Sequence, residues 1–140
     1  MRLLAVALLA LAAACQSSEP PPTGNFSARI FEDIPTPKEA RYIDHDYESF
    51  SYQAPTWRSG RFHFGYKGGE ARAISFFRRM MTNPTYGWTF EKEDRRRAGS
   101  TTLFFTKNDD RCRIDIDSQP ALVDGRREDV DIMVRVNHRR

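Results

Sequence analysis

The stretch from Gly69 to Trp88 most constrains the fold, because it is the one segment after residue 14 with the pattern of an amphipathic helix. Apolar side chains recur in it at spacings of three and four residues: Ala73, Phe76, Phe77, Met80 and Met81. This spacing places them on one face of a helix. Asn83-Pro84 predicts the end of that helix, since proline disfavours the helical conformation in the residue before it.

Short alternating runs surround the predicted helix and are typical of strands with one buried face. These runs are Tyr47–Gln53, Gly60–Lys67, Trp88–Asp94, Thr101–Lys107, Arg111–Asp117 and Asp129–Asn137. In the third run, Trp88 and Phe90 are predicted to face inward, and Thr89, Glu91 and Glu93 outward. The order of two strands, one helix and four strands predicts an α+β domain. We expect two layers, with the helix on a largely antiparallel sheet of about five to six strands.

The amino terminus has the pattern of an export signal. Arg2 precedes an almost unbroken apolar run that ends at Ala14. The run has roughly a dozen residues, fewer than the about 20 needed to span a bilayer. Residues 1–14 are therefore predicted to be a signal peptide.

The residues that end this signal, Leu11-Ala12-Ala13-Ala14-Cys15, resemble the lipobox of bacterial lipoproteins. The resemblance implies that Cys15 carries acyl chains, among them palmitate, and becomes the new amino terminus. Two or more acyl chains would anchor the protein stably in a membrane. Gln16 after the cysteine implies the outer membrane, facing the periplasm, in an envelope of the Gram-negative type. Ordinary signal cleavage beside an unmodified Cys15 is the alternative.

Residues 15–33 are rich in serine and proline and predict a flexible tether, and residues 34–138 predict one folded domain. From residue 34 onward the layout resembles small bacterial lipoprotein domains of unknown function. Short motifs carry this resemblance: Ile34-Pro35-x-Pro37, Phe50-x-Tyr52, Gly60-Arg61, Phe76-Phe77-Arg78-x-Met80, Tyr86-Gly87-Trp88, Phe104-x-Thr106-Lys107 and Cys112-x-Ile114. The resemblance implies a fold but no activity.

Charge does not favour a nucleic-acid partner. Without residues 1–14 the chain has 21 basic and 19 acidic residues, a net charge of about +2. An exported protein of nearly balanced charge is not expected to bind nucleic acid.

Candidate chemical centres are sparse, and no catalytic residue, metal site or cofactor is predicted. Asp44-His45-Asp46 combines imidazole with carboxylates, but adjacent residues rarely point at one ion, and His63 and His138 lie at no ligand spacing from it. No nucleophile motif or glycine-rich phosphate loop is present. Cys112 alternates with isoleucines, which predicts a buried, inert thiol.

Two features remain as candidate interaction sites. Arg95, Arg96 and Arg97 concentrate positive charge at a predicted hairpin tip, Arg95–Gly99, where they would contact an anionic surface or an acidic partner. A solvated turn is the plain alternative. Trp57 lies between two predicted strands, and together with Tyr86 it would form an interaction patch.

These observations predict a non-enzymatic, lipid-anchored envelope protein that binds another envelope component. The alternative is an enzyme or small-ligand binder with a pocket between helix and sheet, lined by Phe62, Phe64, Phe77 and Met81.

Overall fold

The computed structural model describes residues 25–27, 30–43, 49–118, 122–123, 126–127 and 130–138. Its elements are one helix and ten strands: β1 (Asn25–Ser27), β2 (Ala40–Tyr42), β3 (Phe50–Gln53), β4 (Arg58–Tyr66), α1 (Glu70–Met81), β5 (Thr89–Arg97), β6 (Ser100–Lys107), β7 (Asp110–Asp117), β8 (Leu122–Val123), β9 (Arg126–Arg127) and β10 (Val130–His138). In this part of the chain no helix has the length and apolar character to cross a membrane.

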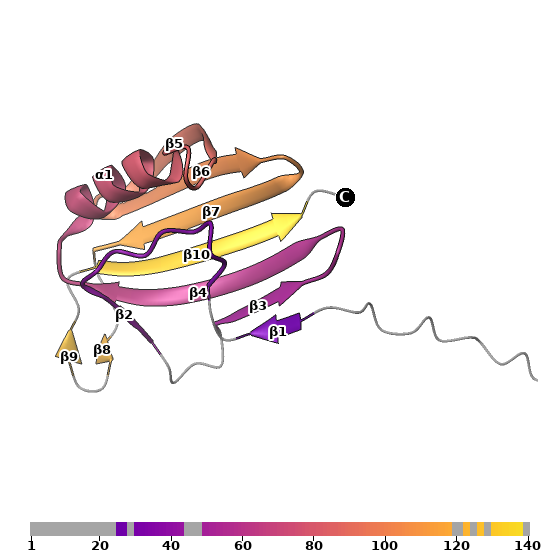
Figure 1. Ribbon diagram of the computed structural model, residues 1–140. Coiled ribbons are helices and arrows are strands. Elements are labelled where there is room, and N and C mark those ends of the chain that lie inside the picture. The colour runs from indigo at the N-terminus through magenta and orange to yellow at the C-terminus, as the bar shows by residue number, and fades with distance from the viewer. Residues whose placement is uncertain are drawn as a thin grey trace, which may run out of the picture.

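Eight of the strands form one sheet in which all pairings are antiparallel (Figure 1). The strand order is β1-β3-β4-β10-β7-β6-β5, and β2 pairs with β4 beside β3. The last strand, β10, therefore lies in the middle of the sheet, between β4 and β7. Strands β8 and β9 form a separate small hairpin.

One face of the sheet, here called the inner face, carries the core. Strict alternation in the central strands places apolar side chains on it, including Ile114, Ile116, Ile132 and Val134, all of which are fully buried. Helix α1 packs against β5 and β7 and adds Ala73, Phe77 and Met81 to the same core (Figure 1).

The irregular segment of residues 30–39 covers the rest of the inner face. Phe31 and Ile34 belong to the core cluster, and the Phe31 ring contacts the Phe62 ring edge-on at 6.2 Å between centroids. Gly60 makes room for this packing, since a Cβ there would lie 2.9 Å from Cε2 of Phe31. In the stretch predicted as a tether, residues 25–27 thus form a strand and Phe31 is buried.

The predicted two-layer α+β architecture is wrong. The structure is dominated by its sheet, which has eight strands rather than five to six, and contains a single helix of 12 residues. Two of the sheet's strands, β1 and β2, come from stretches without a strand pattern. Because residues 30–39 cover part of the inner face without regular structure, the helix does not form a complete second layer.

A β-bulge in β5 changes which side chains face outward. The pairing shifts between Phe90 and Lys92, so Lys92 pairs with Phe104 on the outer face and Glu93 pairs with Leu103 on the inner face. Glu93 there approaches Arg78 of α1 at 3.5 Å. The prediction that Glu93 faces outward is therefore wrong, because alternation cannot reveal an inserted residue.

Candidate functional site

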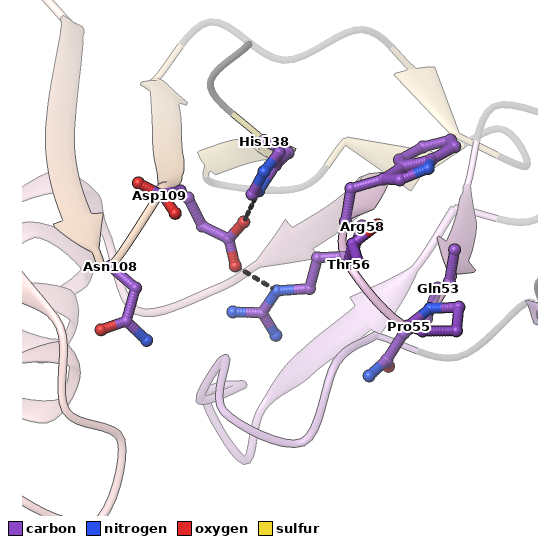
Figure 2. A pocket seen from close by; sticks show the side chains of 10 residues that line it. Gln53, Pro55, Thr56, Arg58, Asn108, Asp109 and His138 are labelled. Carbon is purple, nitrogen blue, oxygen red and sulfur yellow. Dashed lines mark hydrogen bonds and ion pairs between the residues drawn. The ribbon is translucent and has the colours of Figure 1, made fainter.

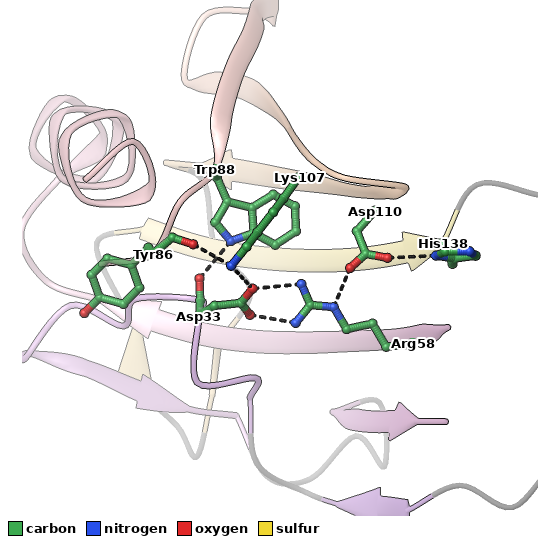
Figure 3. Close-up of polar contacts among 7 residues, drawn as sticks. All are labelled: Asp33, Arg58, Tyr86, Trp88, Lys107, Asp110 and His138. Carbon is green, nitrogen blue, oxygen red and sulfur yellow. Dashed lines mark hydrogen bonds and ion pairs between the residues drawn. The ribbon is translucent and has the colours of Figure 1, made fainter. Parts of the chain in front are cut away.

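A row of polar residues closes the core at one end of the sheet. Arg58 begins β4, Asp110 begins β7, Lys107 ends β6 and His138 ends β10. Each lies two residues from a buried inner-face position, so alternation points all four toward the inner face. Asp33, from the covering segment, completes the group, here called the end cluster (Figure 3).

Charges of opposite sign alternate through the end cluster. The Asp33 carboxylate accepts two parallel hydrogen bonds from the Arg58 guanidinium, at 2.7 and 2.8 Å, and one from Lys107 Nζ at 2.7 Å. Arg58 Nε also donates to Asp110 Oδ2 at 2.6 Å. The other Asp110 oxygen lies 3.0 Å from His138 Nδ1, whose N–H donates to it. Bidentate pairing of this kind fixes direction as well as charge.

The electrostatics of the cluster favour the ionised forms of Asp33 and Arg58. Burial raises the pKa of Asp33, but hydrogen bonds from Arg58 and Lys107 outweigh it and hold the pKa below its ordinary value. Burial lowers the pKa of Arg58, and the carboxylates of Asp33 and Asp110 more than reverse this, so its pKa is raised. The two groups therefore remain a charged pair.

Backbone groups and aromatic rings attach the end cluster to the rest of the fold (Figure 3). The Trp88 indole N–H donates to the Asp33 carbonyl at 2.8 Å, and Lys107 Nζ donates to the Tyr86 carbonyl at 2.7 Å. The Arg58 guanidinium lies 4.9 Å from the Phe31 ring centroid and 5.5 Å from that of Trp88. The cluster thus connects the covering segment, the residues that follow α1 and the ends of the strands.

An open pocket of about 340 Å³ borders this cluster, shares Arg58, Asp110 and His138 with it, and is here called the end pocket (Figure 2). Its walls are the β3–β4 turn, the β6–β7 turn and the end of β10. The lining residues are Gln53, Ala54, Pro55, Thr56, Trp57, Arg58, Asn108, Asp109, Asp110 and His138. Most of these side chains carry hydrogen-bonding groups.

Trp57 is the large apolar side chain that the end pocket exposes. It is 37% exposed, and its ring stacks on Tyr52 with centroids 4.8 Å apart and planes inclined by 37°. A turn in which the Ala54 N–H donates to the Trp57 carbonyl at 2.9 Å positions it. The predicted interaction residue Trp57 thus lies at the rim of a pocket.

Tyr86, predicted to join Trp57 in a patch, does not line the end pocket. Its half-buried side chain packs against the core, and its carbonyl oxygen binds Lys107. Both aromatic residues are next to the end cluster: Trp57 lines the end pocket together with Arg58, and the Tyr86 carbonyl accepts a hydrogen bond from Lys107.

The three predicted arginines lie at the opposite end of the sheet. Arg97 pairs with Ser100 at the start of β6, whereas Lys107 ends that strand. They occupy the end of β5 rather than the hairpin turn itself. Arg95 forms an exposed ion pair with Glu93 at 2.9 Å and Arg97 one with Asp117 at 3.2 Å, while Arg96 is exposed.

Cys15 and Asp44-His45-Asp46 lie outside the described residues. Within the described ranges no group of three or more His, Cys, Asp and Glu side chains is arranged to hold a metal ion. The predicted burial of Cys112 is confirmed, at 1% exposure, and burial strongly raises its thiol pKa.

Sequence reasoning missed the end cluster. Asp33, Arg58, Lys107 and Asp110 all flank predicted elements, where charged residues are ordinary, and they are separated by up to 77 positions in the chain. Alternation was the available signal. Each strand residue of the cluster lies two positions from a buried apolar or glycine residue of the inner face, so its polar side chain is expected on that face as well.

Comparisons with known proteins give no family assignment. No family model matches the sequence, and neither a curated protein nor a solved structure is significantly similar to the chain.

Proposed function

We propose that this chain is a lipid-anchored, non-enzymatic protein of the cell envelope that binds a glycan in the end pocket. The observation that carries the proposal is the exposed Trp57 ring, supported by Tyr52, at the rim of a pocket with polar walls. A flat aromatic ring packs against the C–H face of a sugar, while amide, carboxylate and imidazole groups bond its hydroxyls.

The polar walls are held in place before any ligand arrives. Asp110 is fixed by Arg58 on one side and by His138 on the other, and Arg58 is itself held by Asp33. Binding therefore requires little ordering of these side chains, which favours affinity. Gln53, Asn108 and Asp109 are exposed at the pocket and available to sugar hydroxyls.

The composition of the end pocket favours binding over covalent catalysis. Asp110 and His138 form a carboxylate–imidazole pair, yet the lining residues include no serine or cysteine that such a pair would activate. Thr56 supplies the only aliphatic hydroxyl among these lining side chains.

The alternative pocket between helix and sheet receives less support. Phe62, Phe64, Phe77 and Met81, the residues predicted to line it, are at most 1% exposed and belong to one core cluster. Side chains packed in this way fill the space between α1 and the sheet.

Anchoring rests on the lipobox resemblance at Cys15 and on the proline-rich residues that follow it. We propose outer-membrane attachment with the domain in the periplasm if the envelope has two membranes. A glycan such as peptidoglycan would then lie within reach of the tethered domain.

Tryptophan fluorescence tests glycan binding. Trp57 is exposed and the other tryptophan, Trp88, is 3% exposed, so a sugar that stacks in the pocket should change the emission of Trp57 selectively. We expect soluble peptidoglycan fragments to shift the emission with saturation, and Trp57→Ala to bind at least tenfold more weakly in calorimetry. Trp57→Phe should retain most of the affinity because it keeps an aromatic platform.

A matched control uses the far end of the sheet. The triple change of Arg95, Arg96 and Arg97 to alanine should leave glycan affinity unchanged. Equal affinity of Trp57→Ala and the unaltered protein would refute the pocket assignment, and loss of binding in the arginine variant alone would move the site to the end of β5.

Anchoring has its own test. Cys15→Ser should release the protein from washed membranes, because the thiol that accepts the lipid is missing. Retention of the serine variant in the membrane fraction would exclude acylation at Cys15 as the anchor.

A further inference from the structure

The outer face of the sheet carries a row of mostly basic side chains that crosses five strands. Arg61, Arg135 and Arg113 lie directly opposite one another on β4, β10 and β7. Phe104 of β6 is next in register, followed by Lys92, which the bulge in β5 places on this face. We call these five residues the basic row.

Like charges placed directly opposite each other destabilise a sheet, so the basic row needs compensation. Asp115 supplies part of it. Arg113 donates to the Asp115 carboxylate at 2.9 Å, and Arg135 bonds its other oxygen. The Thr102 hydroxyl donates to the same carboxylate at 2.7 Å, so one anion serves two guanidinium groups.

A hollow of about 340 Å³ opens beside the basic row. Lys92, Phe104, Arg113 and Arg135 line it together with Glu91 and Arg111. Phe104 is half-buried, with Lys92 Nζ 4.7 Å and the Arg113 guanidinium 6.0 Å from its ring centroid. Within the part of the chain that the structure describes, the Arg111 side chain forms no hydrogen bond or ion pair.

The charge of this hollow specifies the kind of ligand that would complete it. Its four cations are accompanied by three carboxylates: Asp115, which Arg113 and Arg135 share, Asp94, which pairs with Lys92 at 3.0 Å, and Glu91. One positive charge is left uncompensated, and the hollow therefore favours an anionic ligand. A phosphate monoester carries a charge of about −1.5 to −2 at pH 7 and has three strong acceptor oxygens. Arginine pairs bind such groups through parallel hydrogen bonds.

We propose that this outer-face hollow binds a small soluble phosphate monoester. The phosphate lies among Arg111, Arg113 and Arg135, and Lys92 adds charge from the β5 side. The organic part of the ligand rests on the Phe104 ring. Asp115 holds two of the arginines in position for the phosphate. The site is separate from the end pocket, which opens at the strand ends, and does not depend on the glycan proposal.

Calorimetry on the purified full-length protein tests the site, with glucose 1-phosphate as the probe and glucose as the uncharged comparison. We expect saturable binding of glucose 1-phosphate and none of glucose at the same concentrations. Arg111→Gln should weaken the binding about tenfold without changing thermal stability, since the Arg111 side chain has no partner among the described residues to lose. The double variant R113Q and R135Q should abolish it.

The matched control is the double variant R72Q and R79Q, which removes two exposed arginines from α1 and the same net charge. It should bind glucose 1-phosphate as the unaltered protein does. Affinity should rise from pH 5 to pH 7 as the phosphate loses its second proton, whose pKa is about 6.

If R72Q and R79Q weakened the binding of glucose 1-phosphate as much as R113Q and R135Q do, binding would depend only on the net charge of the protein, and the proposal would be overturned. Binding to vesicles that contain phosphatidic acid, without binding to glucose 1-phosphate, would assign the face to a membrane instead. Unchanged affinity in Arg111→Gln together with the R113Q and R135Q pair would show that the ester binds elsewhere.

Discussion

The two faces of the sheet are made by the same strands but differ in the burial of their side chains and in how fully their charges are paired. On the inner face Ile114 and Ile116 are fully buried, and even the polar end cluster matches each cation with a carboxylate. On the outer face Arg113 and Arg135 share Asp115, and their side chains remain 38% and 37% exposed. The inner face therefore stabilises the fold, whereas the outer face leaves arginine side chains partly exposed to solvent.

The strongest way to break this contrast is to remove a buried ring. Phe77→Ala should lower the free energy of unfolding by about 4 kcal/mol, because a fully buried phenylalanine leaves a cavity between α1 and the sheet. Denaturant unfolding followed by circular dichroism measures it. Phe104→Ala, on the outer face, should lose less than half as much. Equal losses would mean that both faces contribute similarly to stability.

Removing the central charge of the end cluster should have the next largest effect. Asp33→Asn removes the carboxylate that Arg58 and Lys107 share, which leaves Lys107 without an anionic partner among the described residues and Arg58 with Asp110 alone. We expect a loss of about 2 kcal/mol after allowance for partial exposure. Asp94→Asn is the comparison, because the Asp94 side chain is 42% exposed and pairs only with Lys92 among the described residues. Equal unfolding midpoints for Asp33→Asn and Asp94→Asn would contradict the ranking.

The stability of the protein at acid pH should also depend on Asp33. The pKa of Asp33 is lower in the folded protein than its ordinary value, so its contribution to stability is present above about pH 4 and is lost as the pH falls through the folded-state pKa. Unfolding free energies measured between pH 6 and pH 3 should therefore fall more steeply in the unaltered protein than in Asp33→Asn. Parallel curves would mean that another carboxylate governs acid sensitivity.

The smallest effect is expected at the far end of β5. Changing Arg95, Arg96 and Arg97 to alanine should alter stability by less than about 0.5 kcal/mol, because the Arg95 and Arg97 side chains are 75% and 68% exposed. A thermal melt of this triple variant suffices. A large loss would show that these arginines contribute to the stability of the fold.

Local patterns predicted several elements well. The helix lies within the predicted Gly69–Trp88 stretch, and Cys112 and the isoleucines that alternate with it in β7, Ile114 and Ile116, are buried. The spacing of apolar residues depends only on the local sequence, so it predicts the buried side of a helix or strand whatever the rest of the chain does. The number of strands was underestimated because β1 and β2 have three residues each, too few for a pattern.

The candidate sites were predicted less completely. Trp57 was identified as an exposed aromatic residue in a turn, but its pocket depends on the β6–β7 turn and on His138, which are more than 50 residues further along the chain. Tyr86 has a similar sequence context and packs against the core instead. Exposure of an aromatic side chain depends on what packs over it, which a single stretch of sequence does not specify.

The sequence by itself determined the amphipathic face of α1 and the inner-face residues of the central strands, because both follow from spacing along the chain. Only the tertiary structure decided that β10 lies between β4 and β7, a placement that sets Arg135 between Arg61 and Arg113 and His138 beside Asp110. Strand order and register are set by long-range pairing, in which residues more than 70 positions apart become neighbours. The end cluster and the basic row both arise from that pairing.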